Sequence, residues 1–168
     1  IHDICQAVYA MRHPSKELEG LYPKAAFLDS REVVLFGEKG FVLYQADSKK
    51  IETQENFESE INSVFCTNQK LGFIFKNEDD NGKYRMEIYN KAGKKSSTYY
   101  FDLDYSGMTA DDDEVILYND EEMLIYQMGG RVRFRGTFNT AVTGVMPSWE
   151  DGLYWLIDDQ SLREIRIR

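Results

Sequence analysis

MLIYQMGG, at residues 123–130, has two counterparts in this 168-residue chain. FVLYQADS at 41–48 and MEIYNKAG at 86–93 share its layout: a bulky residue, an aliphatic residue two places on, then Tyr, an amide side chain and a turn. Segments that recur at intervals of roughly 40 residues indicate an array of similar supersecondary units. We therefore expect Tyr44, Tyr89 and Tyr126 to occupy equivalent positions in successive sheets, because equivalent residues of a repeat have equivalent neighbours.

Each repeat contains short segments typical of strands. Continuous apolar runs lie at 33–36, 71–75, 115–118 and 153–157, and shorter segments precede them at 25–28, 61–65, 105–108 and 142–146. Turn-forming residues follow the apolar runs at 37–40, 77–82, 119–122 and 158–161. More polar, alternating segments at 51–57, 97–103 and 131–138 are typical of edge strands with one wet face. This repeated order of segments predicts an all-β chain that folds as a β-propeller built of four-stranded antiparallel blades.

We expect the blades at 22–57, 61–103, 105–138 and 142–168, the last without its outer strand. Residues 1–21 form a separate N-terminal segment, in which Ile4–Ala10 fits a helix or a strand and is taken as a strand. In a complete four-bladed ring, this segment would close the ring by pairing beside Leu162–Ile167. In the alternative, the chain is the tail of a larger propeller, and the last edge is covered by upstream sequence or another chain.

Composition restricts the classes of partner. The net charge of −9 argues against nucleic acid and anionic membrane surfaces, which bind through Lys and Arg. No apolar run is long enough to cross a bilayer, so this segment is expected to make no membrane contact. The chain is 42% hydrophobic, enough for a packed core, which we place mainly in the apolar runs that start at Val33, Leu71, Val115 and Leu153.

Metal sites have little support in the sequence. Cys5 and Cys66 lack CxxC spacing, and free thiols are favoured over a disulfide. The tip Asn77–Gly82 has the first half of a calcium loop, but position twelve is Ile88, where a bidentate carboxylate is needed. We interpret it as a solvated hairpin turn, and 111–114 (DDDE) as a solvated run of like charges. No metal or cofactor is predicted.

No catalytic constellation is recognisable. His2 and His13 both precede the repeats, and no Gly-rich phosphate loop follows a strand. The three repeated tyrosines are expected to pack between blades with hydrogen-bonded hydroxyls rather than to line a ligand surface. Trp149 and Trp155 are expected in the core rather than as a sugar-binding platform. We predict no catalytic, cofactor-binding or metal-ligating residue.

YNKAGK at 89–94 is similar to a phrase that recurs in WD40-like and quinoprotein-like propellers. The tail from 145–147 (VMP) through 162–168 (LREIRIR) resembles the C-terminal part of an uncharacterised family of bacterial, membrane-anchored propeller proteins. The resemblance implies a propeller fold, an extracytoplasmic location and a protein or cell-envelope partner. The Gly-His and Trp-Asp marks of WD40 blades are missing, as are the Trp-docking motifs and adjacent cysteines of quinone-dependent dehydrogenases. No functional residue is therefore carried over.

Two function hypotheses follow. The first is a non-catalytic binding or scaffold module, which the repeats, the acidic composition and the lack of a catalytic constellation favour. The alternative is an enzyme or enzyme fragment that acts on carbohydrate, with carboxylates from several blades at the mouth of the propeller channel. Apolar residues along that channel would contradict the enzyme hypothesis, and carboxylates there with raised pKa values would favour it.

Overall fold

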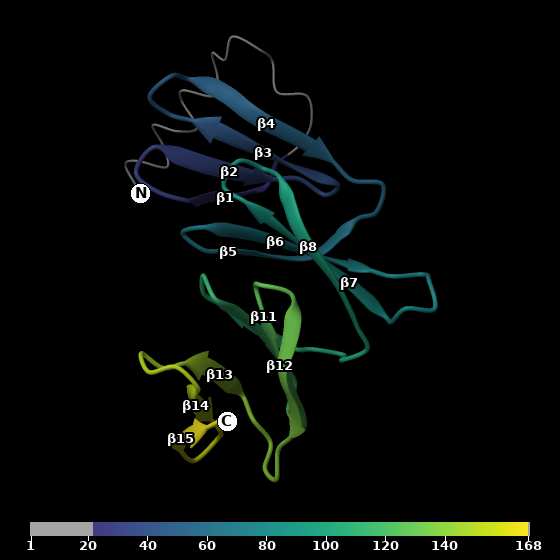
Figure 1. Ribbon diagram of the computed structural model, residues 1–168, viewed down its shortest axis with the longest axis vertical. Helices are drawn as coiled ribbons and strands as arrows, with labels where there is room; N and C mark the ends of the chain where they lie inside the picture. Colours follow the sequence, from purple (N-terminus) through teal and green to yellow (C-terminus); the bar gives the residue numbers. More distant parts are fainter. Residues whose placement is uncertain (1–21, 168) are drawn as a thin grey trace. The chain divides into compact units, whose positions relative to one another are not determined.

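A computed structural model describes residues 22–167 of the chain (Figure 1). The regular elements in this range are fifteen β-strands in four antiparallel sheets. The first sheet contains β1 (Lys24–Phe27), β2 (Glu32–Phe36), β3 (Gly40–Gln45) and β4 (Lys50–Asn56); the second contains β5 (Ile61–Cys66), β6 (Lys70–Lys76), β7 (Tyr84–Asn90) and β8 (Lys95–Phe101). The third contains β9 (Gly107–Ala110), β10 (Glu114–Tyr118), β11 (Glu122–Gln127) and β12 (Arg131–Thr137); the fourth contains β13 (Gly144–Pro147), β14 (Leu153–Ile157) and β15 (Leu162–Arg166).

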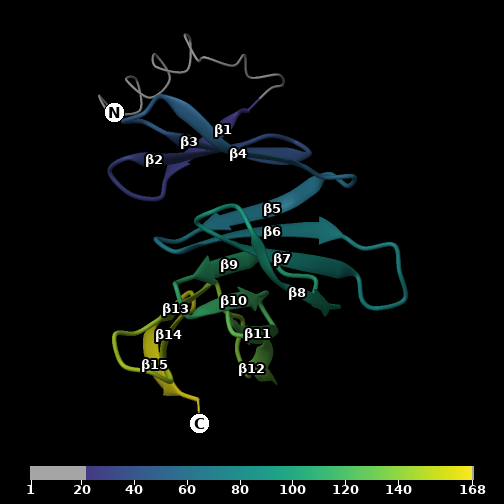
Figure 2. The same ribbon diagram turned by 45° about the horizontal axis from the view of Figure 1, so that its top comes forward.

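In every sheet the strands lie side by side in the order in which they occur along the chain (Figures 1 and 2). The predicted all-β chain of antiparallel blades is therefore confirmed, including the missing outer strand of the last sheet. The first strand of the third sheet starts later than predicted, at Gly107 rather than at Tyr105. The ring of Tyr105 instead packs against those of Tyr84 and Phe101, with centroids 5.4 and 6.0 Å apart.

Tyr44, Tyr89 and Tyr126 are each the penultimate residue of the third strand of their sheet. In the first and third sheets, the register against the fourth strand shifts immediately before this Tyr. The shared sequence layout therefore corresponds to a shared strand position. The hydroxyls of Tyr89 and Tyr126 donate hydrogen bonds to the Glu87 carboxylate (2.8 Å) and the Tyr100 carbonyl (2.9 Å).

Tyr44 departs from the expected hydrogen-bonded hydroxyl. Its side chain is fully buried, and its hydroxyl has no hydrogen-bond partner among residues 22–167. The prediction is right for two of the three tyrosines and wrong for this one, because the sequence repeats the ring but not the acceptor.

The chain forms two compact units, which are described separately. The first unit comprises the residues up to 76 together with 87–96, and the second comprises 77–86 together with the residues from 97 onward. In the first unit, Phe41 stacks on Phe73 with ring centroids 4.9 Å apart, and Phe57 approaches Phe75 at 5.0 Å. The buried residues of this cluster are Leu28, Val34, Phe36, Phe41, Leu43, Leu71, Phe73, Phe75 and Tyr89.

The core of the second unit joins the third and fourth sheets. Its buried residues are Ile116, Met123, Ile125, Val142, Val145, Tyr154, Leu156 and Ile167. The apolar runs of the second strands are largely buried, as predicted, although Val33 and Leu35 form a separate cluster with Val42. The third strands are buried as deeply, because a strand in the middle of a four-stranded sheet packs on both faces.

The predictions for the cysteines, the N-terminal segment and membrane contact have different outcomes. Cys66 is a free thiol, and burial raises its pKa to about 11. Cys5, the strand at Ile4–Ala10 and its pairing beside the last strand lie outside the described residues. In the range that the structure describes, no helix is long and apolar enough to span a membrane.

Candidate functional site

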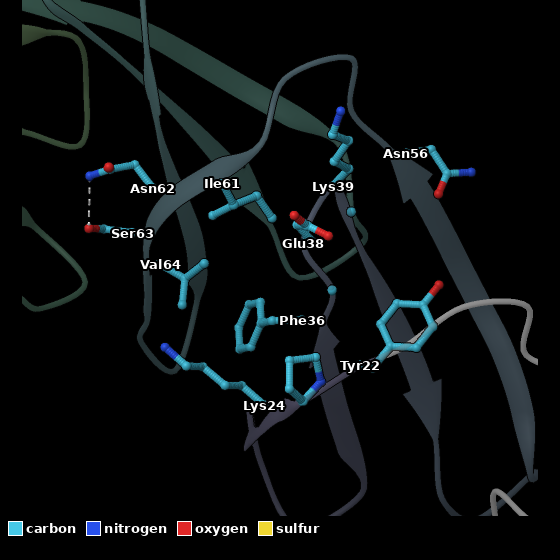
Figure 3. A pocket seen from close by; sticks show the side chains of 13 residues that line it. Tyr22, Lys24, Phe36, Glu38, Lys39, Asn56, Ile61, Asn62, Ser63 and Val64 are labelled. Carbon is cyan, nitrogen blue, oxygen red and sulfur yellow. Dashed lines mark hydrogen bonds between the residues drawn. The ribbon is translucent and has the colours of Figure 1, made fainter.

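Two cavities in the first unit form a groove between β1 and β5. The larger, of about 620 Å³, is lined by residues 22–24, 36–40, 56 and 61–64 (Figure 3). The smaller, of about 500 Å³, is lined by residues 23–26, 36 and 64–66. Because both cavities share Pro23, Lys24, Phe36 and Val64, they lie next to each other, and we call them together the β1–β5 groove.

Local backbone contacts shape the groove. The amide of Phe57 donates to the Lys39 carbonyl (2.7 Å) and that of Ile61 donates to the Glu38 carbonyl (2.8 Å), so the β2–β3 turn is fastened to the start of β5. The pairing of β5 with β6 skips Asn62, which is the extra residue of a β-bulge. Bulges re-aim side chains, and Asn62 is exposed at the edge of the cavity.

The lining of the groove combines an apolar floor with a polar rim. Phe36 is buried at the floor, with Ile61 and Val64 from β5 half-buried beside it (Figure 3). Lys24 and Lys39 stand at the rim, and neither forms an ion pair with another residue of the described range. Such a surface can bury an apolar side chain and pair with an anionic group.

The second unit contains an ion cluster around the buried Glu114. The Tyr154 hydroxyl donates to Glu114 Oε2 (2.9 Å), and Arg133 Nη1 lies 3.3 Å from the same oxygen and 2.7 Å from Asp151 Oδ1. Glu114 is 5% exposed. Burial raises the pKa of Glu114, against the opposing effects of Tyr154 and Arg133, whereas Arg133 lowers the pKa of Asp151.

This Glu114 cluster adjoins a cavity of about 540 Å³ lined by residues 111, 113, 114, 127, 129, 133 and 147–153. The predicted solvated run at 111–114 is right for the exposed Asp113 and wrong for Glu114. The turn explains the difference: Asp111 Oδ1 accepts hydrogen bonds from the amides of Asp113 and Glu114, both at 2.8 Å, and Glu114 then begins β10. The sequence feature that indicates the burial of Glu114 is its position directly before the apolar run at 115–118.

The same turn occurs in the first sheet. Asp29 Oδ1 accepts from the amides of Arg31 and Glu32, and Glu32 is 8% exposed. Glu32 lies opposite Gln45, as Glu114 lies opposite Gln127. The buried glutamate therefore recurs in the first and third sheets, whereas the second strands of the other two sheets begin with Lys70 and Leu153.

Trp149 also lines the second unit's cavity, and here the prediction is wrong. Its side chain is 88% exposed rather than in the core, because it sits in the turn before β14, where the Ser148 amide donates to the Leu153 carbonyl (2.9 Å). Gly152, at φ +78°, completes the turn. Trp155, by contrast, is half-buried, and its ring centroid lies 6.2 Å from that of Trp149.

The remaining candidates are structural or lie outside the described range. The Asn77 side-chain amide nitrogen donates to the carbonyls of Asp79 and Gly82, so it closes its own turn. Between residues 22 and 167, no group of three or more His, Cys, Asp or Glu side chains is placed to hold a metal ion. His2 and His13 lie outside the described residues.

Comparison with known proteins gives a family and a fold. A family model described as "Family of unknown function (DUF5711)" matches residues 15–167, and the chain belongs to this family. A search of curated proteins finds no match.

Several solved structures are similar, and they are β-propellers. BBS1N in complex with ARL6DN is 13% identical with a TM-score of 0.58, over 90% of this chain and 53% of that one. A structure named as the eukaryotic initiation factor is 11% identical with a TM-score of 0.62, over 92% and 43%. Kluyvelomyces marxianus Hsv2 is 10% identical with a TM-score of 0.54, over 88% and 49%. The chain thus spans about half the length of the propellers that it matches, and the likeness establishes the fold alone.

Proposed function

We propose that this member of a family of unknown function is a non-catalytic binding module of β-propeller type whose partner is a protein. The observation that carries the proposal is the β1–β5 groove, with its apolar floor at Phe36 and, at its rim, two lysines that form no ion pair with another described residue. An apolar centre surrounded by polar groups is the usual anatomy of a protein-recognition surface. The similar BBS1N structure is a complex with another protein, ARL6DN, so the fold has a precedent for this use.

The Glu114 cluster supports a structural role for the most deeply buried acid of the second unit. Glu114 begins β10, Arg133 lies in β12, and Tyr154 lies in β14, so the cluster ties the third sheet to the fourth. An Arg shared by two carboxylates favours their ionised forms. That arrangement suits an ion pair between strands better than it suits a proton-donating acid.

Capture of partners from an extract of the source organism tests the proposal. The immobilised wild-type chain is compared with Asn62→Trp, which places a bulky ring at the groove, and with Asn68→Trp, a matched exposed substitution outside it. We expect a defined set of proteins to be retained by the wild type and by Asn68→Trp and to be lost from Asn62→Trp. Identical retention by all three proteins would contradict binding at the groove.

A second candidate function is the hydrolysis of carbohydrate. One observation favours it: the exposed Trp149 lines the same cavity as Glu114, whose pKa is raised. Glycosidases use paired carboxylates of which one has a raised pKa, and here Glu114 and Asp151 contact the same Arg133 nitrogen. Release of nitrophenol from a panel of aryl glycosides, with Glu114→Gln and Trp149→Ala as variants, tests it. No release by the folded wild-type chain would exclude this candidate for that panel.

A further inference from the structure

β1 is an edge strand of the first sheet, as β5, β9 and β13 are of theirs. β1 pairs with β2 from Lys24 to Phe27 without interruption, and among the described residues no other strand pairs with it. The amide and carbonyl groups that point away from β2 are therefore available to another strand. β5, across the groove, is a poorer template because its bulge at Asn62 interrupts the register.

In the second unit, the equivalent first strands are joined to each other. Thr109 of β9 donates its hydroxyl to the Val145 carbonyl of β13 at 2.9 Å. In the first unit, the corresponding space between β1 and β5 is the groove. The first strands of neighbouring sheets are thus bridged by a hydrogen bond in the second unit and, among the described residues, separated by a groove in the first.

The face that β1 presents to the groove has a definite chemistry. Lys24 lies opposite Phe36 and Ala26 lies opposite Val34, so these two β1 side chains share the face of the apolar floor. Lys24 and Lys39 outnumber Glu38 among the charged residues that line the groove, whereas the whole chain has a net charge of −9. The groove is a locally cationic site on an acidic protein, and charge complementarity favours an acidic ligand.

We propose that the β1–β5 groove binds an extended acidic peptide segment of a partner protein, which adds as a strand to the free edge of β1. The inference rests on the proposed function and names its ligand class. Backbone hydrogen bonds to β1 hold the segment, apolar side chains contact Phe36 and Val64, and carboxylates pair with Lys24 and Lys39. An acidic polysaccharide could satisfy the lysines but not the strand edge, which makes the backbone the distinguishing feature.

A synthetic peptide tests the proposal directly. The probe is fluorescein-labelled Glu-Val-Glu-Ile-Glu-Val-Glu, and its binding to the full chain is followed by fluorescence anisotropy. We expect saturable binding that weakens at least tenfold in the double variant Lys24→Glu/Lys39→Glu. The control Lys50→Glu/Lys94→Glu makes the same change in net charge at exposed lysines outside the groove, and it should bind as the wild type does.

Two further arms test strand addition. A probe N-methylated at alternate residues keeps its charge and side chains but loses backbone donors, and it should bind at least tenfold more weakly. Hydrogen exchange of the amides of 24–27 should slow when the unmodified probe binds, whereas that of 107–110 in β9 should not change. Circular dichroism of each variant verifies that it is folded.

The outcomes separate this inference from the proposed function. Absence of saturable binding, equal loss in both double variants, or equal affinity for the N-methylated probe would each overturn the strand-addition proposal. Competition by dextran sulfate that also removes the dependence on backbone methylation would assign the groove to polyanions instead. If proteins are captured through the groove while the probe does not bind, the proposed function stands and the acidic-strand ligand is wrong.

Discussion

Replacing Arg133 with Met should make the stability of the second unit strongly dependent on pH. Arg133 is 21% exposed and its partner Glu114 is 7% exposed by side chain, so the substitution leaves a carboxylate in a poorly hydrated site with only the Tyr154 hydroxyl beside it. Removing one partner of a fully buried pair costs about 3–5 kcal/mol, and the partial exposure of Arg133 reduces this. We expect a loss of about 2 kcal/mol in the free energy of unfolding at pH 8.

The sign of the pH dependence follows from Glu114. Its pKa is already raised in the folded state, and losing Arg133 raises it further. The folded variant then binds more protons than the unfolded chain as the pH rises above the ordinary Glu value of 4.5, so its stability falls with pH through that window. Asp151 also makes the difference between wild type and variant grow with pH. In the wild type, Arg133 lowers the pKa of Asp151 below 3.8 and so stabilises the fold above that pH, and the variant lacks this contribution.

Urea unfolding at pH 5 and pH 8, followed by tryptophan fluorescence, measures the effect. Both tryptophans of the chain, Trp149 and Trp155, belong to the second unit, so the signal reports on that unit. The difference between wild type and Arg133→Met should be larger at pH 8, and Glu114→Gln in the Met variant should remove most of this increase. A difference that is the same at both pH values, or unaffected by Glu114→Gln, would refute the reasoning.

Four other substitutions are expected to separate core-packing, steric and hydroxyl effects in urea unfolding. Leu117→Ala should cost about 2–5 kcal/mol, because Leu117 is fully buried, and a loss below about 1 kcal/mol would place it outside the core. Gly72→Ala should cost about 1–3 kcal/mol, because a Cβ at this position overlaps the ring of Phe65; an unchanged midpoint would mean that the ring can move aside. Tyr126→Phe should cost about 1 kcal/mol and Tyr44→Phe about zero, since only the Tyr126 hydroxyl is hydrogen-bonded; equal losses would contradict the assignment.

The sequence predicts the strands well because each repeat carries its own local signals. The apolar run, the turn and the Tyr-amide phrase all lie within one blade, and they locate strands such as β2 and β14 to within one residue. The expectation for Trp149 is wrong because residue type alone favours burial, whereas its position in a turn exposes it. The expectation for the Tyr44 hydroxyl is wrong because the acceptors differ between sheets: Tyr89 uses Glu87 of its own strand and Tyr126 uses Tyr100 of β8, and neither acceptor is repeated for Tyr44.

The sequence does not predict the groove or the ion cluster, because the residues that form them come from separate segments. The groove is lined by segments from β1, the β2–β3 turn and β5, and none of them carries a distinctive motif. The Glu114 cluster joins residues from β10, β12 and β14, so the partners of Glu114 lie up to 40 positions away in the sequence. The repeat predicts which residues occupy equivalent positions in different sheets. The side chains that contact each of these residues come partly from the next sheet, and they differ from one sheet to another.

Because Glu32 and Glu114 occupy equivalent positions but have different partners, their replacement by Gln should change the stability of the chain in opposite directions. Glu32 and Glu114 both begin a second strand and are both buried, but only Glu114 has a hydroxyl and a guanidinium beside its carboxylate. Burial, together with the nearby carboxylate of Glu52, raises the pKa of Glu32, and Glu32 has no ion pair with another described residue. Its charged form therefore opposes folding above pH 4.5, the more so as the pH rises.

Glu32→Gln should accordingly stabilise the chain at pH 8 and have little effect at pH 4.5. Glu114→Gln should destabilise it at pH 8 through its partners: burial raises the pKa of Glu114, but the substitution leaves Arg133 and the Tyr154 hydroxyl facing a neutral side chain and weakens their charge-assisted bonds. Thermal unfolding followed by circular dichroism registers both substitutions in one assay, which matters because the first unit contains no tryptophan. Shifts of the same sign at pH 8 would mean that the partners in the neighbouring sheet do not determine whether a buried glutamate stabilises its blade.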